Sequence, residues 1–212
     1  MNVRSAKDAK IEVHQGDIPA GLDFGAAVAV DTEAMGLINH RDRLCLVQLS
    51  AGDGTAHLVK FNADDDYAAP NLRALLEDAN VTKIFHYARF DIALISQYLG
   101  VACTPLYCTK IASQLARTYT DGHGLKHLCR EVLDIEISKT QQSSDWGAPI
   151  LSDEQILYAA SDVLYLHRLR AALDAMLVRE GRAELLQACF AFLPTRAALD
   201  LKGWIDIDIF HH

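Results

Sequence analysis

The sequence lacks the features that mark membrane and secreted proteins. No apolar run approaches the ~18 residues of a membrane span. The N-terminal segment has no apolar stretch after its first charges, so we expect no signal peptide. The 5 cysteines are odd in number and form no C-x-x-C pair, which is typical of reduced thiols. We therefore expect a cytoplasmic protein that does not bind membranes.

The sequence also lacks an excess of positive charge. It has 20 Lys and Arg against 28 Asp and Glu, and its net charge is -8. This balance argues against a broad basic surface that follows a long nucleic acid. A short nucleic-acid substrate stays possible, because bound divalent cations would offset several acids locally. No G-x-G-x-x-G motif follows a predicted strand, which excludes a dinucleotide-binding oxidoreductase of that type.

The apolar pattern predicts an α/β protein. Three β-branched or alternating segments precede a helix, a fourth strand and a run of amphipathic helices. We expect a mixed central β-sheet flanked by α-helices, in one domain over residues 1–212. The strands are expected at 26–31, 43–50, 55–61 and 82–87, and the helices at 71–79, 90–100, 109–119, 124–133 and 152–177.

Two acids close the first predicted strand, where one polar residue would be enough. Asp31 and Glu33 follow the apolar run 26–30 with one residue between them. Because side chains alternate along an extended chain, both acids point to the same side of the strand. Two carboxylates on one side can bind the same cation.

Two further acids stand where a core residue or a helix start is expected. Asp162 lies in an apolar stretch of the long helix, with Tyr158 one turn before it. Asp91 follows the fourth strand, and alone it would be read as an acid at a helix start. Four carboxylates without a thiolate or imidazole pattern predict a site for Mg²⁺ or Mn²⁺. Two such ions can activate a water and stabilise a phosphoryl leaving group.

Three motifs carry a resemblance to a known family. D-x-E at Asp31 and Glu33, "HYARFD" ending at Asp91, and Y-x-x-x-D at Tyr158 and Asp162 resemble, in this order, the motifs of DEDDy-type 3′-5′ exonucleases. That family has a ribonuclease H-like fold. The segments "HRDRLCLVQLS", "RTYTDGHGLKHLC" and "YAASDVLYLHRL" resemble ribonuclease D and, more closely, the stand-alone nanoRNase C proteins of alphaproteobacteria. We expect no counterpart in this sequence of the helical HRDC domains that follow the nuclease in ribonuclease D.

The resemblance implies a role for each motif residue. Asp31, Glu33 and Asp162 would hold one metal ion, and Asp31 would bridge to a second ion near Asp91. Tyr158 would orient the attacking water or deprotonate it, and the sequence leaves both roles open. Hydrolysis would release nucleoside 5′-monophosphates from a 3′ end.

The resemblance also implies a substrate and an assembly. The substrate would be short RNA, down to dinucleotides, or single-stranded DNA, and the protein would form a ring-shaped homo-octamer. Leu37 would wedge against the terminal base, although it could instead be a core residue. His86 and Phe90 would line the base pocket. The apolar tail 201–210 is expected to dock on its own domain or on a neighbour.

Other interpretations stay open at this point. The protein could be a broader exonuclease that trims longer RNA or single-stranded DNA, or a degenerate nuclease that only binds RNA. His123 and His127 are four residues apart, which fits a zinc clamp, but a solvated helix end explains them better. Four basic residues could contact phosphate or simply carry surface charge: Arg117, Lys126, Arg130 and Lys139.

Overall fold

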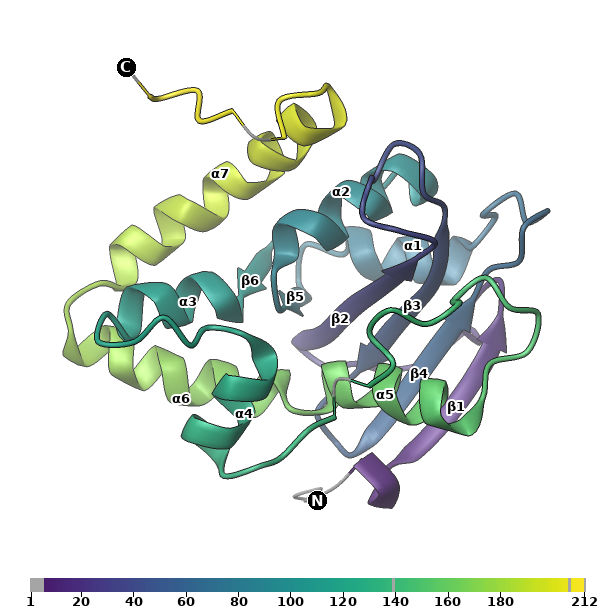
Figure 1. Cartoon of the computed structure of the whole chain (residues 1–212), viewed down its shortest axis with the longest axis horizontal. Helices are drawn as coiled ribbons and strands as arrows, with labels where there is room; N and C mark the ends of the chain where they lie inside the picture. Colours follow the sequence, from purple (N-terminus) through teal and green to yellow (C-terminus); the bar gives the residue numbers. More distant parts are fainter. Residues whose placement is uncertain (1–5, 139, 206, 212) are drawn as a thin grey trace.

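The computed structural model, which describes residues 6–138, 140–205 and 207–211, contains a six-stranded sheet in the order β1-β4-β3-β2-β5-β6 (Figure 1). β2 pairs antiparallel with β3, and β3 pairs antiparallel with β4. β1 pairs parallel with β4, β5 with β2, and β6 with β5. The predicted mixed sheet is therefore confirmed. The strands are β1 Lys10–Gln15, β2 Ala27–Ala34, β3 Leu44–Ser50, β4 Thr55–Lys60, β5 Thr82–Phe85 and β6 Leu106–Cys108.

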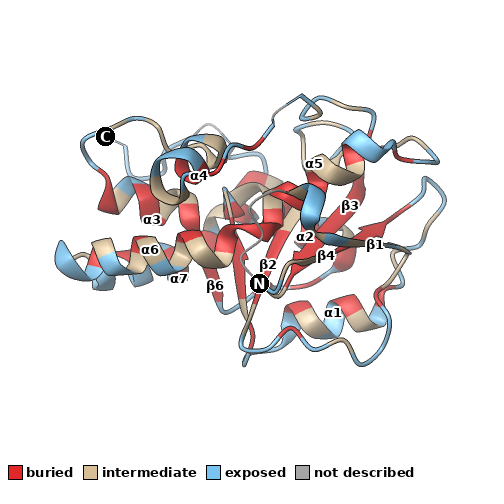
Figure 2. Cartoon of the chain, turned by 90° about the horizontal axis from the view of Figure 1, so that it is seen from below, coloured by how far each residue is buried: buried red, intermediate tan, exposed pale blue. Residues whose placement is uncertain are grey.

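Helices cover both faces of the sheet and extend beyond its β6 edge. Figure 2 shows α5 and α1 on opposite faces, and α3, α4, α6 and α7 gather beside β6 (Figure 1). None of the helices within the described residues is long and apolar enough to cross a bilayer. The helices are the short 3₁₀ turn Ala6–Asp8, α1 Pro70–Glu77, α2 Ala88–Leu99, α3 Thr109–Ala116, α4 Leu125–Leu133, α5 Asp153–Leu164, α6 Leu166–Arg179 and α7 Ala183–Leu201.

Strand register sorts the side chains of the sheet into two faces. On one face Leu46 and Leu58 pack in a buried cluster with Ala159 of α5. On the other face Val47 and Val59 join the larger core, which includes α1. Burying such a side chain stabilises the fold by about 1.5–3 kcal/mol. This packing fixes α5 over the strands that carry the predicted acids.

The apolar run predicted that the first strand ends at its acids, but the strand continues past them. β2 continues to Ala34, because β3 pairs with it as far as Leu44, with an irregularity between Glu33 and Ala34. Asp31 and Glu33 therefore lie inside the hydrogen-bonded ladder. The pattern also missed β1 and β6, since β1 is rich in polar residues and β6 has only 3 residues.

The single helix predicted over residues 152–177 is two helices. α5 begins after a cap at Ser152, where the Ser152 and Gln155 side chains each accept a hydrogen bond from the other's backbone N–H. It ends at Leu164, and α6 starts after the buried Tyr165. α5 packs against β3 and β4, whereas α6 packs against α3 and α4. The break lets each half follow its own partners, which an uninterrupted apolar pattern cannot reveal.

Candidate active site

The central strand β2 presents two carboxylates toward α5. Asp31 lies opposite Gln48 of β3, and Glu33 lies opposite Leu46, which packs under α5. The Gln48 side-chain amide donates a hydrogen bond of 3.2 Å to Asp31 Oδ2. Because the ladder fixes both residues of the pair, the direction of these carboxylates is set by the strand backbone.

α5 brings a third carboxylate to the same place. One oxygen of Asp162 lies within 4.8 Å of one oxygen of both Asp31 and Glu33. Tyr158 lies one turn earlier on the same helix, and its ring packs 5.9 Å from the ring of the buried Trp146. The trio that the resemblance assigned to one ion is thus the trio that the fold gathers.

The fourth acid, Asp91, comes from the first turn of α2. It is 3% exposed, and its Oδ1 accepts a hydrogen bond of 2.7 Å from the Thr32 hydroxyl. Asp91 does not belong to the group of three, but its charge raises the pKa of Glu33 and the charge of Asp31 raises its own pKa. Tyr87 precedes α2 in a left-handed conformation, with φ of 70°, which turns the chain from β5 into the helix.

Burial and neighbouring negative charges disfavour the charged forms of the acids at this site. Burial raises the pKa of Asp31 to about 7, and burial together with the charges of the other three acids raises the pKa of Glu33 to about 10. Burial and the charge of Asp31 also raise the pKa of Asp91. Within the described residues no ion pair involves Asp31, Glu33 or Asp91. Clustered oxygen ligands of this kind fit a divalent cation.

The pKa of Tyr158 is shifted in the same direction as those of the acids. Burial raises its pKa above the usual range for a phenol, and the charges of Asp162, Glu33 and Asp31 add to this effect. The phenol therefore holds its proton at neutral pH in the metal-free protein. In this state Tyr158 can donate a hydrogen bond.

One cavity of about 360 Å³ joins the residues predicted from the sequence. Leu37 stands at this cavity and is 86% exposed, so its interpretation as a core residue is wrong. His86 lines it as well, with its Nδ1 2.9 Å from the Thr109 hydroxyl. The cavity is lined by all of the predicted site residues: Asp31, Glu33, Leu37, His86, Phe90, Asp91, Tyr158 and Asp162.

The motifs did not point to every residue that lines this cavity. Lys110 reaches it, with its Nζ 4.2 Å from the centre of the Tyr87 ring, and Gln142 lines it from the loop before α5. Neither residue belongs to one of the three motifs, and both meet the motif residues only in space. The signal that could have found Lys110 is its position in the first turn of the helix that follows β6.

The basic residues predicted as phosphate contacts have different surroundings in the structure. Lys126 lines the cavity. Arg117 is buried and paired with Glu131, and Arg130 contacts the same glutamate, which argues for structural roles. Lys139 lies outside the described residues.

The sequence matches a known family over most of its length. Residues 13–178 match the model of a 3′-5′ exonuclease domain. Ribonuclease D of Acidiphilium cryptum is 37% identical over 157 residues, which are 74% of this chain and 39% of that protein. The chain therefore spans about two fifths of the length of this relative.

Solved structures extend the likeness to nearly the whole chain. Brucella melitensis NrnC bound to pGG is 55% identical, with a TM-score of 0.92 over 96% of this chain and 99% of that one. The same protein has also been solved with bound Mg²⁺, at 54% identity and a TM-score of 0.91 over 96% and 99% of the two chains. Escherichia coli RNase D is 26% identical, with a TM-score of 0.70 over 81% and 45%. These likenesses confirm the ribonuclease H-like fold.

Proposed function

This chain belongs to the 3′-5′ exonuclease family, and from this membership we propose that it degrades very short RNA, down to dinucleotides, to nucleoside 5′-monophosphates. The observation that carries the proposal is the single cavity in which the four acids, the tyrosine and the candidate base contacts meet. The likeness to a protein solved with pGG supports the short substrate.

We propose that the acids hold two divalent metal ions, Mg²⁺ or Mn²⁺. Asp31, Glu33 and Asp162 would hold one ion, and Asp31 with Asp91 would hold the other. The crowding of carboxylates supports this set, because the raised pKa values of Asp31, Glu33 and Asp91 are of the kind that a bound positive charge would relieve. When bound, such ions lower the pKa of a water molecule and stabilise the leaving oxygen.

Tyr158 acts in this proposal as a positioning group. In the metal-free protein its raised pKa keeps the phenol protonated, and in that form it donates a hydrogen bond. Packing against Trp146 limits the directions that its ring can take. The hydroxyl therefore orients the attacking water beside Asp162.

The far end of the cavity would bind the 3′ end of the substrate. Leu37 offers an exposed apolar side chain that can stack on a terminal base without reading its sequence. His86 and Phe90 would enclose that base from the second motif. Lys110 and Lys126 line the cavity and would contact phosphate.

A length series tests the proposal. Turnover of matched RNA and DNA chains of two to twenty nucleotides, in Mg²⁺, separates the short-substrate enzyme from a broader exonuclease. We expect the diribonucleotide to be cleaved fastest. Equal or slower cleavage of the dinucleotide would favour the broader enzyme, for which the likeness to RNase D is the supporting observation. Binding of RNA without hydrolysis in either series would favour the degenerate nuclease.

We also propose a cytoplasmic homo-oligomer, with the octamer resting on the family likeness. The tail after α7 supports an assembly, because Trp204, Ile207 and Phe210 are exposed there. The tail is also held to its own chain, as Arg196 donates to the carbonyl of Ile207 at 3.0 Å. The 5 cysteines are free, as expected in a reducing compartment. A mass measurement in solution tests the oligomeric state.

A further inference from the structure

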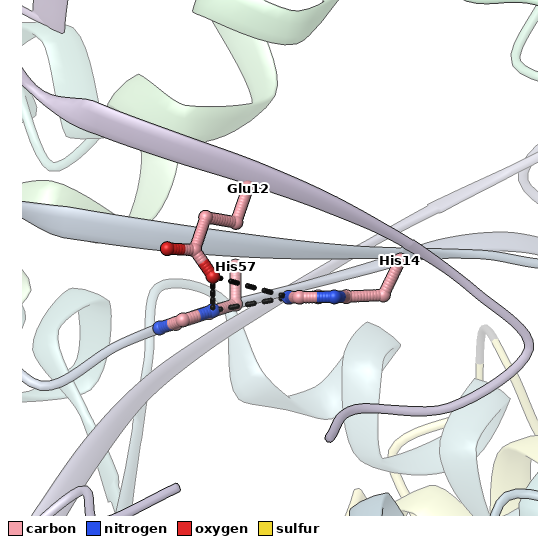
Figure 3. Close-up of side chains that lie close together, drawn as sticks. All are labelled: Glu12, His14 and His57. Carbon is pink, nitrogen blue, oxygen red and sulfur yellow. Dashed lines mark hydrogen bonds and ion pairs between the residues drawn. The ribbon is translucent and has the colours of Figure 1, made fainter.

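A second group of metal-ligand side chains lies at the β1 edge of the sheet. Glu12 and His14 come from β1, and His57 comes from β4 (Figure 3). We call these three residues the histidine cluster. Glu12 and His57 are register partners, and His14 lies two residues beyond Glu12. All three side chains therefore project from the same face.

This face is the one opposite the acids of β2. His14 pairs with Val59, Val59 with Val47, and Val47 with Thr32, whose side chain points away from Asp31 and Glu33. β3 also lies between β4 and β2. At about 4.8 Å for each strand spacing, the histidine cluster is roughly 10 Å or more from the acids. It is therefore a separate site.

The three ligand atoms are spaced for one metal ion. His14 Nε2 lies 3.1 Å from His57 Nδ1, and Glu12 Oε2 lies 3.5 Å from His57 Nδ1 and 3.9 Å from His14 Nε2. The point equidistant from these three atoms is about 2.0 Å from each of them, which is the bond length of Zn²⁺ to imidazole nitrogen and carboxylate oxygen.

The surroundings hold the ligands in this arrangement. Lys10 pairs with Glu12 Oε1 at 2.5 Å, which leaves Oε2 toward the imidazoles. The edge of the Phe24 ring packs on His57, with ring centres 5.6 Å apart.

We propose that the histidine cluster binds a transition-metal ion of the Zn²⁺ class through Glu12 Oε2, His14 Nε2 and His57 Nδ1. Two imidazoles and one carboxylate favour such an ion over Mg²⁺, which prefers oxygen ligands. The side chains of Glu12, His14 and His57 are 31%, 14% and 11% exposed, so solvent can reach the site and supply a fourth ligand. The bound ion would pin the edge strand β1 to β4.

Calorimetric titration with Zn²⁺ tests this site. The protein is stripped of metal and then held in excess Mg²⁺. The Asp31→Asn variant serves as the parent protein, so that the carboxylate cavity binds less of the added Zn²⁺. We expect one Zn²⁺ per chain in the parent. Adding His14→Gln should weaken that binding at least about tenfold. His127→Gln removes an exposed histidine of α4 and should leave the binding unchanged.

Hydrogen exchange supplies a readout that does not depend on affinity alone. Zn²⁺ should slow exchange of the β1 amides in the parent and in His127→Gln, but not in His14→Gln. Glu12→Gln repeats the test if His14→Gln fails to fold, since Glu12 is half-exposed. The proposal is overturned if the parent binds no Zn²⁺, or if loss of either ligand leaves binding and exchange as in the parent. In that case the cluster is a hydrogen-bonded histidine pair only.

Discussion

The sheet carries two groups of ligand side chains that differ in chemistry and in origin. The candidate metal ligands of the cavity beside β2 are carboxylate oxygens, drawn from β2, α2 and α5. The histidine cluster offers two ring nitrogens and one oxygen, drawn from two neighbouring parallel strands. The first arrangement suits a hard cation and the second a softer one. The comparison teaches that one small sheet can present two ligand sets of different chemistry, one on each of its faces.

The largest effect is expected from Glu33→Gln, which removes one carboxylate of the cavity. Hydrolysis of a diribonucleotide in Mg²⁺ should fall by about 10³-fold, because a metal ligand acts directly on the charge of the transition state. Release of nucleoside 5′-monophosphate measures this rate. His14→Gln is the matched control from the other group, and it should retain the wild-type rate. Equal losses of hydrolysis rate in both variants would contradict the assignment of catalysis to the carboxylate cavity alone.

Tyr158→Phe should produce the next largest effect. It removes the hydroxyl but keeps the ring that packs on Trp146. We expect kcat to fall by about 100-fold with little change in KM, because the water loses its orientation. Full pH–rate profiles of both proteins check the role of the phenol. If Tyr158 instead removes a proton, the variant will lose one limb of the wild-type profile.

Leu37→Ala should act on substrate binding without affecting the fold. Loss of a stacking contact should raise KM for a dinucleotide by about tenfold, with similar changes for all terminal bases. The melting temperature should stay unchanged, because Leu37 is 86% exposed. Steady-state kinetics and a thermal melt decide together. A lower melting temperature with unchanged KM would indicate that Leu37 packs in the fold and does not bind substrate.

The smallest effect expected is a pH dependence of stability in the metal-free protein. Asp31 binds a proton with a pKa of about 7 when folded, and with a pKa of about 3.9 when unfolded. The folded state therefore holds more protons than the unfolded state between these values, so the free energy of unfolding falls as pH rises through this window. Glu33, with a folded pKa of about 10, extends the fall to higher pH.

Thermal melts of the stripped protein from acid to mildly alkaline pH measure this dependence. The melting temperature should fall by several degrees, and Mg²⁺ should restore it at the alkaline end, because the cation takes the place of the protons. Glu33→Gln should flatten the dependence, and Glu12→Gln should leave it as in the wild type. A melting temperature that is independent of pH would contradict the crowding of the acids.

The sequence located the carboxylate cavity because its residues occur in motifs. Asp31 and Glu33 break an apolar run, and Asp162 interrupts an apolar helix, so each is conspicuous by itself. The resemblance then joined them to Asp91. The structure adds what distance along the chain conceals: Lys110 and Gln142, which lie outside the three motifs, line the same cavity.

The histidine cluster shows why the rest could not be predicted. His14 and His57 are 43 residues apart, and they meet only because β1 pairs in parallel with β4. β1 itself was not predicted, since polar residues such as Glu12 and His14 interrupt its apolar pattern. In the helical region the apolar pattern instead continues without a break through Tyr165, so it joined α5 to α6. Periodicity reports which face is buried, but it does not report which partner buries it.

The most direct test of the central claim is a time course on a short RNA that carries a label at its 5′ end. In Mg²⁺ the label should pass through products that shorten by one nucleotide at a time, and a chelator should stop the reaction. This result is expected if the carboxylate cavity holds the metal ions and receives a 3′ end. Internal fragments at early times, or an undiminished rate after the chelator is added, would contradict the account.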